Sequence, residues 1–152
     1  MTMCYGFQRT DGNNPGSSAY SLLRPVAEHG QVYTPIVTFT LYDDGCMIKV
    51  EDVFERNIGM FLITKECAKL AACVRKSIHT SFTKRFQVGL RGHLLNGTTR
   101  LGWSTSGHAR MEFTERVVEP GKYPTGTMET KVSIWLETNA RHQLADYLEG
   151  KP

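Results

Sequence analysis

The stretch FLITKECAKLAACV, residues 61–74, joins an apolar strand led by an aromatic residue to a helix that follows Thr64. Shifted by 74 positions, the stretch WLETNARHQLADYL, residues 135–148, has the same order, with Thr138 in the place of Thr64. In each stretch a threonine able to cap a helix follows the strand, and apolar residues then recur at helical spacing. The pattern predicts two copies of a strand-then-helix unit, and a chance likeness between two such junctions is the alternative.

The residues before the first junction predict a hairpin. Apolar and polar residues alternate over 33–42, and the Asp44-Gly45 dipeptide indicates a tight turn before a second strand over 46–53. On the polar face, this turn places Tyr42 beside Lys49. On the apolar face it sets two cross-strand pairs: Leu41 with Ile48, and Phe39 with Val50.

A second hairpin is predicted before the second junction, with its turn at Asn96-Gly97. Its apolar face collects the residues Phe86, Val88, Leu90, Leu94, Leu101 and Trp103. In this register Leu90 lies opposite Trp103, and His93 lies opposite Arg100. The other face has no acidic residue and collects Arg85, Gln87, Gly89, Arg91, His93, Arg100, Gly102, Ser104 and His108.

Further strands are expected over 108–118 and 128–136, with a long turn over 119–126 between them. Both tryptophans, Trp103 and Trp135, are expected in the core. Residues 1–30 form an N-terminal arm, partly irregular, in which 20–23 are a candidate short element. The expected fold class is α+β: two tandem antiparallel sheet-plus-helix repeats, 31–78 and 82–150, fused into one domain over residues 31–152.

Charge is distributed unevenly along the chain of 152 residues, whose net charge is only +3. Between Cys67 and Met111 there is no Asp or Glu, although three histidines occur there. Such a segment predicts a surface for a polyanion; the alternative is that neighbouring segments supply the carboxylates in space. The basic residues of this segment are Lys69, Arg75, Lys76, Lys84, Arg85, Arg91, Arg100 and Arg110.

Signatures of catalysis and of cofactors are missing from the sequence. It contains no GxxxxGK[ST], GxGxxG, HExxH or GxSxG motif, and its four cysteines form no CxxC pair. We therefore expect a non-enzymatic protein without metal or cofactor, whose cysteines are free and mostly buried. No run of eighteen apolar residues and no export-signal pattern is present, so we expect a soluble, cytoplasmic protein, in the host cytoplasm if a bacteriophage encodes it.

Binding of single-stranded DNA or RNA with low sequence specificity fits these features. Such binding requires cations that follow the phosphates and flat side chains on which bases stack. A protein-interaction module or transcription regulator that docks on an acidic partner, such as a polymerase subunit, would use the same residues. The candidate interface residues are Tyr42, Lys49, Lys84, Arg85, Gln87, Arg91, His93, Arg100 and His108.

The two junctions, 61–74 and 135–148, and the hairpins before them resemble the Whirly and PUR-type single-stranded nucleic-acid binders. In those proteins each of two tandem units is an antiparallel sheet followed by a helix. The resemblance implies that the sheets face the nucleic acid. It also implies that the helices hold a homo-oligomer together, a dimer or tetramer, acting in replication or transcription.

Overall fold

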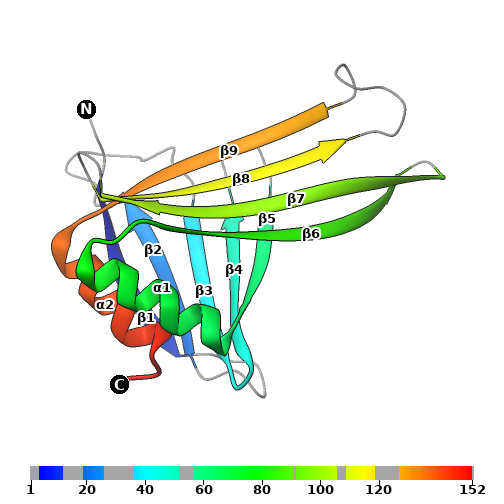
Figure 1. Ribbon diagram of the computed structural model, residues 1–152. Helices are drawn as coiled ribbons and strands as arrows, with labels where there is room; N and C mark the ends of the chain where they lie inside the picture. The colour runs from blue at the N-terminus through cyan, green and yellow to red at the C-terminus, as the bar shows by residue number, and fades with distance from the viewer. Residues whose placement is uncertain are drawn as a thin grey trace.

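Nine strands and two helices are formed in a computed structural model that describes residues 4–11, 19–25, 36–51, 57–90, 92–105, 109–118 and 127–151 (Figure 1). This α+β composition, with antiparallel strands and two helices, confirms the expected class in its coarser form. Two strands lie within the arm that the sequence left largely unassigned, and the second of them includes residues 20–23. The elements are β1 (Cys4–Asp11), β2 (Ala19–Pro25), β3 (Ile36–Tyr42), β4 (Gly45–Glu51), β5 (Asn57–Ile63), α1 (Thr64–Lys76), β6 (Thr80–Leu90), β7 (His93–Ser104), β8 (Arg110–Val118), β9 (Thr127–Leu136) and α2 (Thr138–Leu148).

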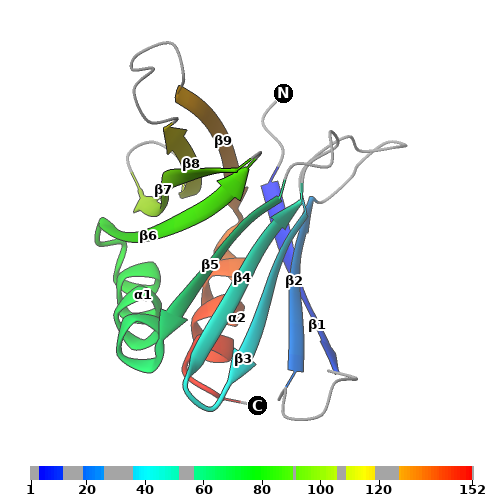
Figure 2. The same ribbon diagram turned by 90° about the vertical axis from the view of Figure 1, so that its right-hand side faces the viewer.

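The strands form one sheet in the order β5-β4-β3-β2-β1-β9-β8-β7-β6. Within β1–β5, here the first block, and within β6–β9, the second block, all neighbours are antiparallel. The blocks join where β1 runs parallel to β9 over only two pairs, Cys4 with Trp135 and Tyr5 with Leu136. Figures 1 and 2 show the second block crossing one end of the first, with the far ends of its strands projecting beyond it.

The β3–β4 hairpin turns at Asp43-Asp44, one residue earlier than predicted. Gly45 is already in β4, where a Cβ would lie 2.1 Å from the carbonyl oxygen of Leu62 on β5. The close approach of two strands therefore requires this glycine, which is not needed for the turn. The predicted register is wrong by two residues: Leu41 lies opposite Cys46, and Phe39 lies opposite Ile48.

The β6–β7 hairpin turns between Leu90 and His93, where Gly92 has a φ of 79° that favours glycine. The predicted turn at Asn96-Gly97 is wrong, because both residues lie within β7. Gly97 lies opposite Phe86, and a Cβ there would be 2.1 Å from Cζ of that ring. Three predicted placements change: His93 pairs with Leu90, Arg100 with Thr83, and Trp103 with Thr80.

One row of apolar side chains crosses all four strands of the second block. Phe82, Leu101, Phe113 and Val132 face one another across four strands, and all are buried. This row joins the buried residues of β3–β5 and of both helices in a single cluster. The core therefore lies between the blocks, with the helices packed in the angle that they form (Figure 2).

The two helices begin in the same way, but not with the expected threonine caps. The residues before them, Ile63 and Glu137, have extended backbones with ψ of 163°, and neither side chain caps its helix. Thr64 and Thr138 are the first helical residues. At α1, the backbone N–H of Ile63 instead donates to Glu66 Oε1 at 3.1 Å.

Some of the side chains predicted to lie in the core are buried there, and others are not. Trp103 is 2% exposed, with the Arg141 guanidinium 5.4 Å from its ring centre, whereas Trp135 is only half-buried and outside the core cluster. Cys46, Cys67 and Cys73 are free and buried, as expected, and the Cys4 side chain lies outside the described part.

Candidate nucleic-acid interface

The second block turns one face away from the core, and we call it the outer face. Its side chains alternate with the buried ones along each strand. Among those that the structure describes, they are Ser81, Thr83, Arg85 and Gln87 on β6; Leu94, Asn96, Thr98, Arg100 and Ser104 on β7; Arg110, Glu112, Thr114 and Arg116 on β8; and Glu129, Lys131, Ser133 and Trp135 on β9. The prediction that Arg85, Gln87 and Arg100 share a face is confirmed, whereas Leu94, expected with the core residues, lies here and is 56% exposed.

Three arginines of the outer face form a diagonal across the strands: Arg85 on β6, Arg100 on β7 and Arg110 on β8. None has an ion-pair partner among the described residues. With about 3.4 Å per residue and 4.8 Å between strands, the Cα atoms of Arg85 and Arg100 are about 8 Å apart, and those of Arg100 and Arg110 about 14 Å. An extended chain of negative charges can follow such a line.

Two carboxylates also lie on the outer face, so the expectation of a face without acids is wrong. Glu129 Oε2 is 2.7 Å from Nη2 of Arg116, and Glu112 Oε1 is 3.4 Å from Nζ of Lys131. Both acids follow Met111, the end of the acid-free segment, in the sequence, and the sheet brings them beside this segment. The described outer face carries more Lys and Arg side chains than carboxylates, so it stays cationic as a whole.

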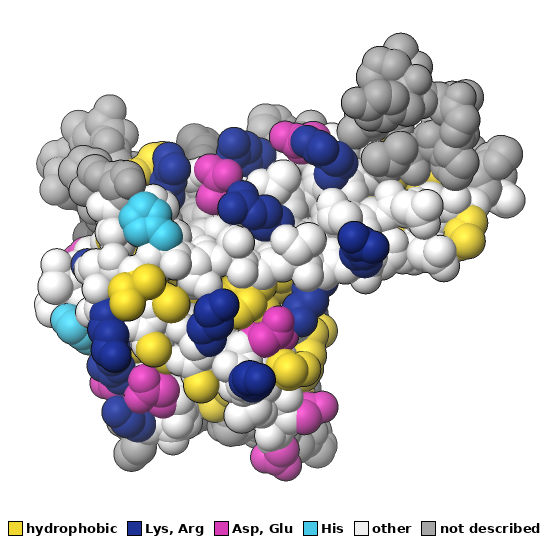
Figure 3. All heavy atoms as spheres, viewed as in Figure 1, with side chains coloured by type: hydrophobic (Ala, Val, Ile, Leu, Met, Phe, Trp, Pro, Cys, Tyr) yellow, Lys and Arg dark blue, Asp and Glu magenta, His cyan; other side chains and the backbone are white. Residues whose placement is uncertain are grey.

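Shallow concavities follow one another along the outer face. One of about 380 Å³ is shared by β6, β7, β8 and His79. The next, of about 320 Å³, shares Arg100 and Glu112 with it, and a third, of about 820 Å³, shares Thr98 and Arg116 with the second. Figure 3 shows Lys and Arg side chains spread over this surface, with acidic side chains between them. Together the linings of the three concavities include all three unpaired arginines.

Other cations of the acid-free segment lie elsewhere and are partly neutralised. Lys84, a candidate from the sequence, points to the inner side of β6, away from the outer face, and forms a salt bridge with Glu66. Partial burial opposes ionisation of Glu66, but the hydrogen bonds from Lys84 and from the Ile63 N–H outweigh it and lower its pKa. Arg75 forms salt bridges with Asp146 and Glu149, which join α1 to α2. For Lys84 and Arg75, therefore, other segments of the chain supply the carboxylates that the acid-free segment lacks, which was the alternative to a surface for a polyanion.

The remaining candidates lie on the first block or outside the described residues. Tyr42 and Lys49 lie on the first block, with β2, β1, β9 and β8 between their strands and β7 in the sheet order. They are not side by side either, because Lys49 pairs with Thr38, four residues from Tyr42. Arg91, His108 and the side chain of His93 lie outside the described residues.

No protein-family model, curated protein or solved structure matches the chain. No helix in the described ranges is long and apolar enough to cross a membrane. Within the same part of the chain, no group of three or more His, Cys, Asp or Glu side chains is placed to hold a metal ion.

Three cations and one aromatic residue of the outer face were not among the candidates from the sequence: Arg110, Arg116, Lys131 and Trp135. Trp135 pairs with Arg110 and is the described aromatic side chain closest in register to the arginine diagonal. The sequence held a usable signal, since Arg110, Glu112, Thr114 and Arg116 alternate with the apolar residues Met111 and Phe113.

Proposed function

We propose that the protein binds single-stranded DNA or RNA, with low overall sequence specificity and without catalysis, across the outer face of β6–β9. The observation that carries the proposal is the diagonal of Arg85, Arg100 and Arg110, which lack carboxylate partners among the described residues. Cations held unpaired beside shallow concavities are suited to phosphates, because each phosphate contact releases condensed counterions. Trp135, half-buried next to Arg110, supplies a flat side chain on which a base can stack.

The shape of the surface favours single strands over a duplex. Reading the major groove requires a helix or ribbon that projects into it with free basic residues. On α1, Arg75 is bound by acids, and on α2 Arg141 donates to the Val74 carbonyl oxygen at 2.9 Å and lies over Trp103. These two arginines of the helices are therefore engaged within the protein, whereas the outer face of the sheet is exposed and can contact the bases of a single strand.

The Whirly and PUR-type resemblance is the finer form of this proposal. Two features support it: the order β2-β3-β4-β5-α1 followed by β6-β7-β8-β9-α2, and the same backbone geometry at both strand-to-helix junctions. The resemblance also leads us to propose a homo-oligomer that acts in replication or transcription. Sedimentation velocity tests the oligomer, and a monomer at all concentrations would argue against it.

A titration followed by fluorescence anisotropy tests the proposed function. We expect labelled oligo(dT) to bind with at least micromolar affinity, a matching duplex to bind more weakly, and both to weaken as salt rises. Labelled poly-glutamate, titrated in the same way, represents an acidic protein partner. Failure of oligo(dT) to bind, with retention of poly-glutamate, would refute the proposal in favour of a protein-interaction module.

A further inference from the structure

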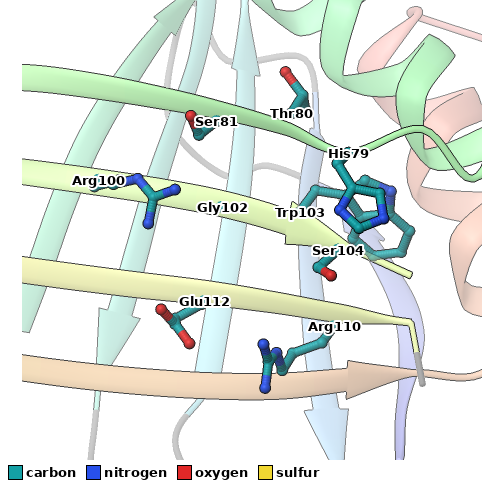
Figure 4. A pocket seen from close by; sticks show the side chains of 9 residues that line it. All are labelled: His79, Thr80, Ser81, Arg100, Gly102, Trp103, Ser104, Arg110 and Glu112. Atoms are coloured by element: carbon teal, nitrogen blue, oxygen red, sulfur yellow. The ribbon is translucent and has the colours of Figure 1, made fainter. Parts of the chain in front are cut away.

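Two serines, one glycine and one glutamate form a row across the outer face, between two rows that carry cations. Ser81, Gly102, Glu112 and Ser133 are aligned on adjacent strands, and we call this row the trough. On one side lie Arg100 and Lys131, and on the other lies Arg110, each about 6.8 Å away along the strands. Figure 4 shows the carboxylate of Glu112 between the two arginines, in the concavity of about 380 Å³.

The guanidinium of Arg100 lies over Gly102, one of the residues of the trough. A Cβ built at Gly102 would lie 3.8 Å from Cζ and from both Nη atoms of Arg100, so the flat side of the guanidinium faces this position. A guanidinium held in this way can stack on a base or donate to its edge. The trough therefore brings together two serines, a carboxylate and two guanidiniums that have no ion-pair partner among the described residues, and one guanidinium lies over Gly102.

A carboxylate is an unexpected group on a surface that binds phosphates, since it repels them. It becomes useful if it accepts hydrogen bonds from a base. Guanine alone among the common bases offers two adjacent donors, N1–H and the N2 amino group, to the two oxygens of a carboxylate. Its O6 and N7 acceptors are in turn the usual target of an arginine. Cytosine and adenine offer only one amino group and thymine one N–H, so guanine matches most of the groups in the trough.

We propose that the trough accepts one guanine base of the bound strand, with Glu112 holding N1–H and N2–H and an adjacent arginine, Arg100 or Arg110, donating to O6 or N7. The inference rests on the proposed function, because the arginine diagonal must first bring a single strand across the trough. It gives the interface a base preference at one position while the rest of the contact stays independent of sequence. Glu112 is 21% exposed, and its Oε1 lies 3.4 Å from Nζ of Lys131, so a base that binds both carboxylate oxygens must displace or share this lysine.

The test compares a short oligothymidylate with the same strand carrying one central guanosine or inosine, which lacks the N2 amino group. We expect the guanosine strand to bind at least about fivefold more tightly than the all-thymidine strand, as for one well-formed bidentate contact. Inosine should lose part of this gain. In Glu112→Gln the ratio between guanosine and thymidine strands should fall close to one, while the affinity for the all-thymidine strand should not fall.

Glu129→Gln is the matched control, since it removes the same charge from the same face outside the trough. It should keep the preference for guanosine. Equal binding of both strands to the wild type, or a preference that survives in Glu112→Gln, would overturn the guanine assignment and leave the proposed function standing. Failure of every single strand to bind would overturn the proposed function itself.

Discussion

Replacing Arg85 and Arg100 together with alanine should make nucleic-acid binding less sensitive to salt. Each phosphate contact with a single strand contributes about 0.7 to the slope of log affinity against log salt concentration. Three unpaired arginines therefore predict a slope of about 2 or steeper in magnitude, and removing two contacts should reduce it by about 1.4. Between about 50 and 200 mM salt, three contacts lose about 20-fold in affinity, whereas one loses about 3-fold.

The assay is a series of anisotropy titrations with labelled oligo(dT) over this range of salt concentrations. Lys65→Ala with Lys76→Ala is the matched control, because both lysines are exposed on α1 and the double change alters net charge equally. We expect the control to keep the wild-type slope. Equal reductions in the two double variants would show that net charge, and not the arginine diagonal, drives binding, and would refute the reasoning.

Tyr42→Ala should change the affinity for oligo(dT) by less than about twofold, because Tyr42 lies on the first block, away from the outer face. A loss of about tenfold in affinity would show that Tyr42 does belong to the interface. Gly97→Ala should lower the free energy of urea unfolding by about 1–3 kcal/mol through its clash with the Phe86 ring. This cost should shrink in a Phe86→Ala background, and an undiminished cost would exclude the clash. Arg75→Ala should lower the urea midpoint at pH 7, because Arg75 and then Lys151 lower the pKa of Glu149 from 4.5 to about 2. That stabilisation is present above the ordinary pKa and is lost as the pH falls, so the two midpoints should converge between about pH 5 and 2; a constant gap would contradict this cause.

The strands and helices were largely predictable from the sequence because periodicity records which face of an element is buried. Alternation over 33–42 and the helical spacing after Thr64 and Thr138 gave elements close to those in the structure. Arg85, Gln87 and Arg100 share a face as predicted because the predicted and observed registers of the hairpin differ by an even number of residues, whereas Leu94, which follows the actual turn, lies on the face opposite to the one predicted for it.

Register was not predictable, because the same dipeptide can serve a turn or a close approach. In both Asp44-Gly45 and Asn96-Gly97 the glycine lies within a strand, where a Cβ would meet Leu62 or Phe86. Such contacts involve residues that are not local in sequence, so a turn rule cannot detect them.

The composition of the interface was predictable only in part, for a related reason. An acid-free segment describes one stretch of chain, whereas a sheet face is assembled from several strands. Glu112 and Glu129, which follow the acid-free segment in the sequence, lie on the outer face. Lys84, which belongs to the acid-free segment, lies on the inner side of β6 and pairs with Glu66. The unpaired cations of the outer face are Arg85, Arg100 and Arg110, which form no ion pair with a described carboxylate.

Mapping of backbone amide chemical shifts during titration with oligo(dT) tests the central claim most directly. The account predicts that perturbations gather at outer-face positions of the second block: Thr83, Thr98, Gly102 and Thr114. Amides of β4 and α1 should stay unperturbed. Shifts confined to the first block or to the helices, at saturating oligo(dT), would contradict the assignment of the nucleic-acid interface to β6–β9.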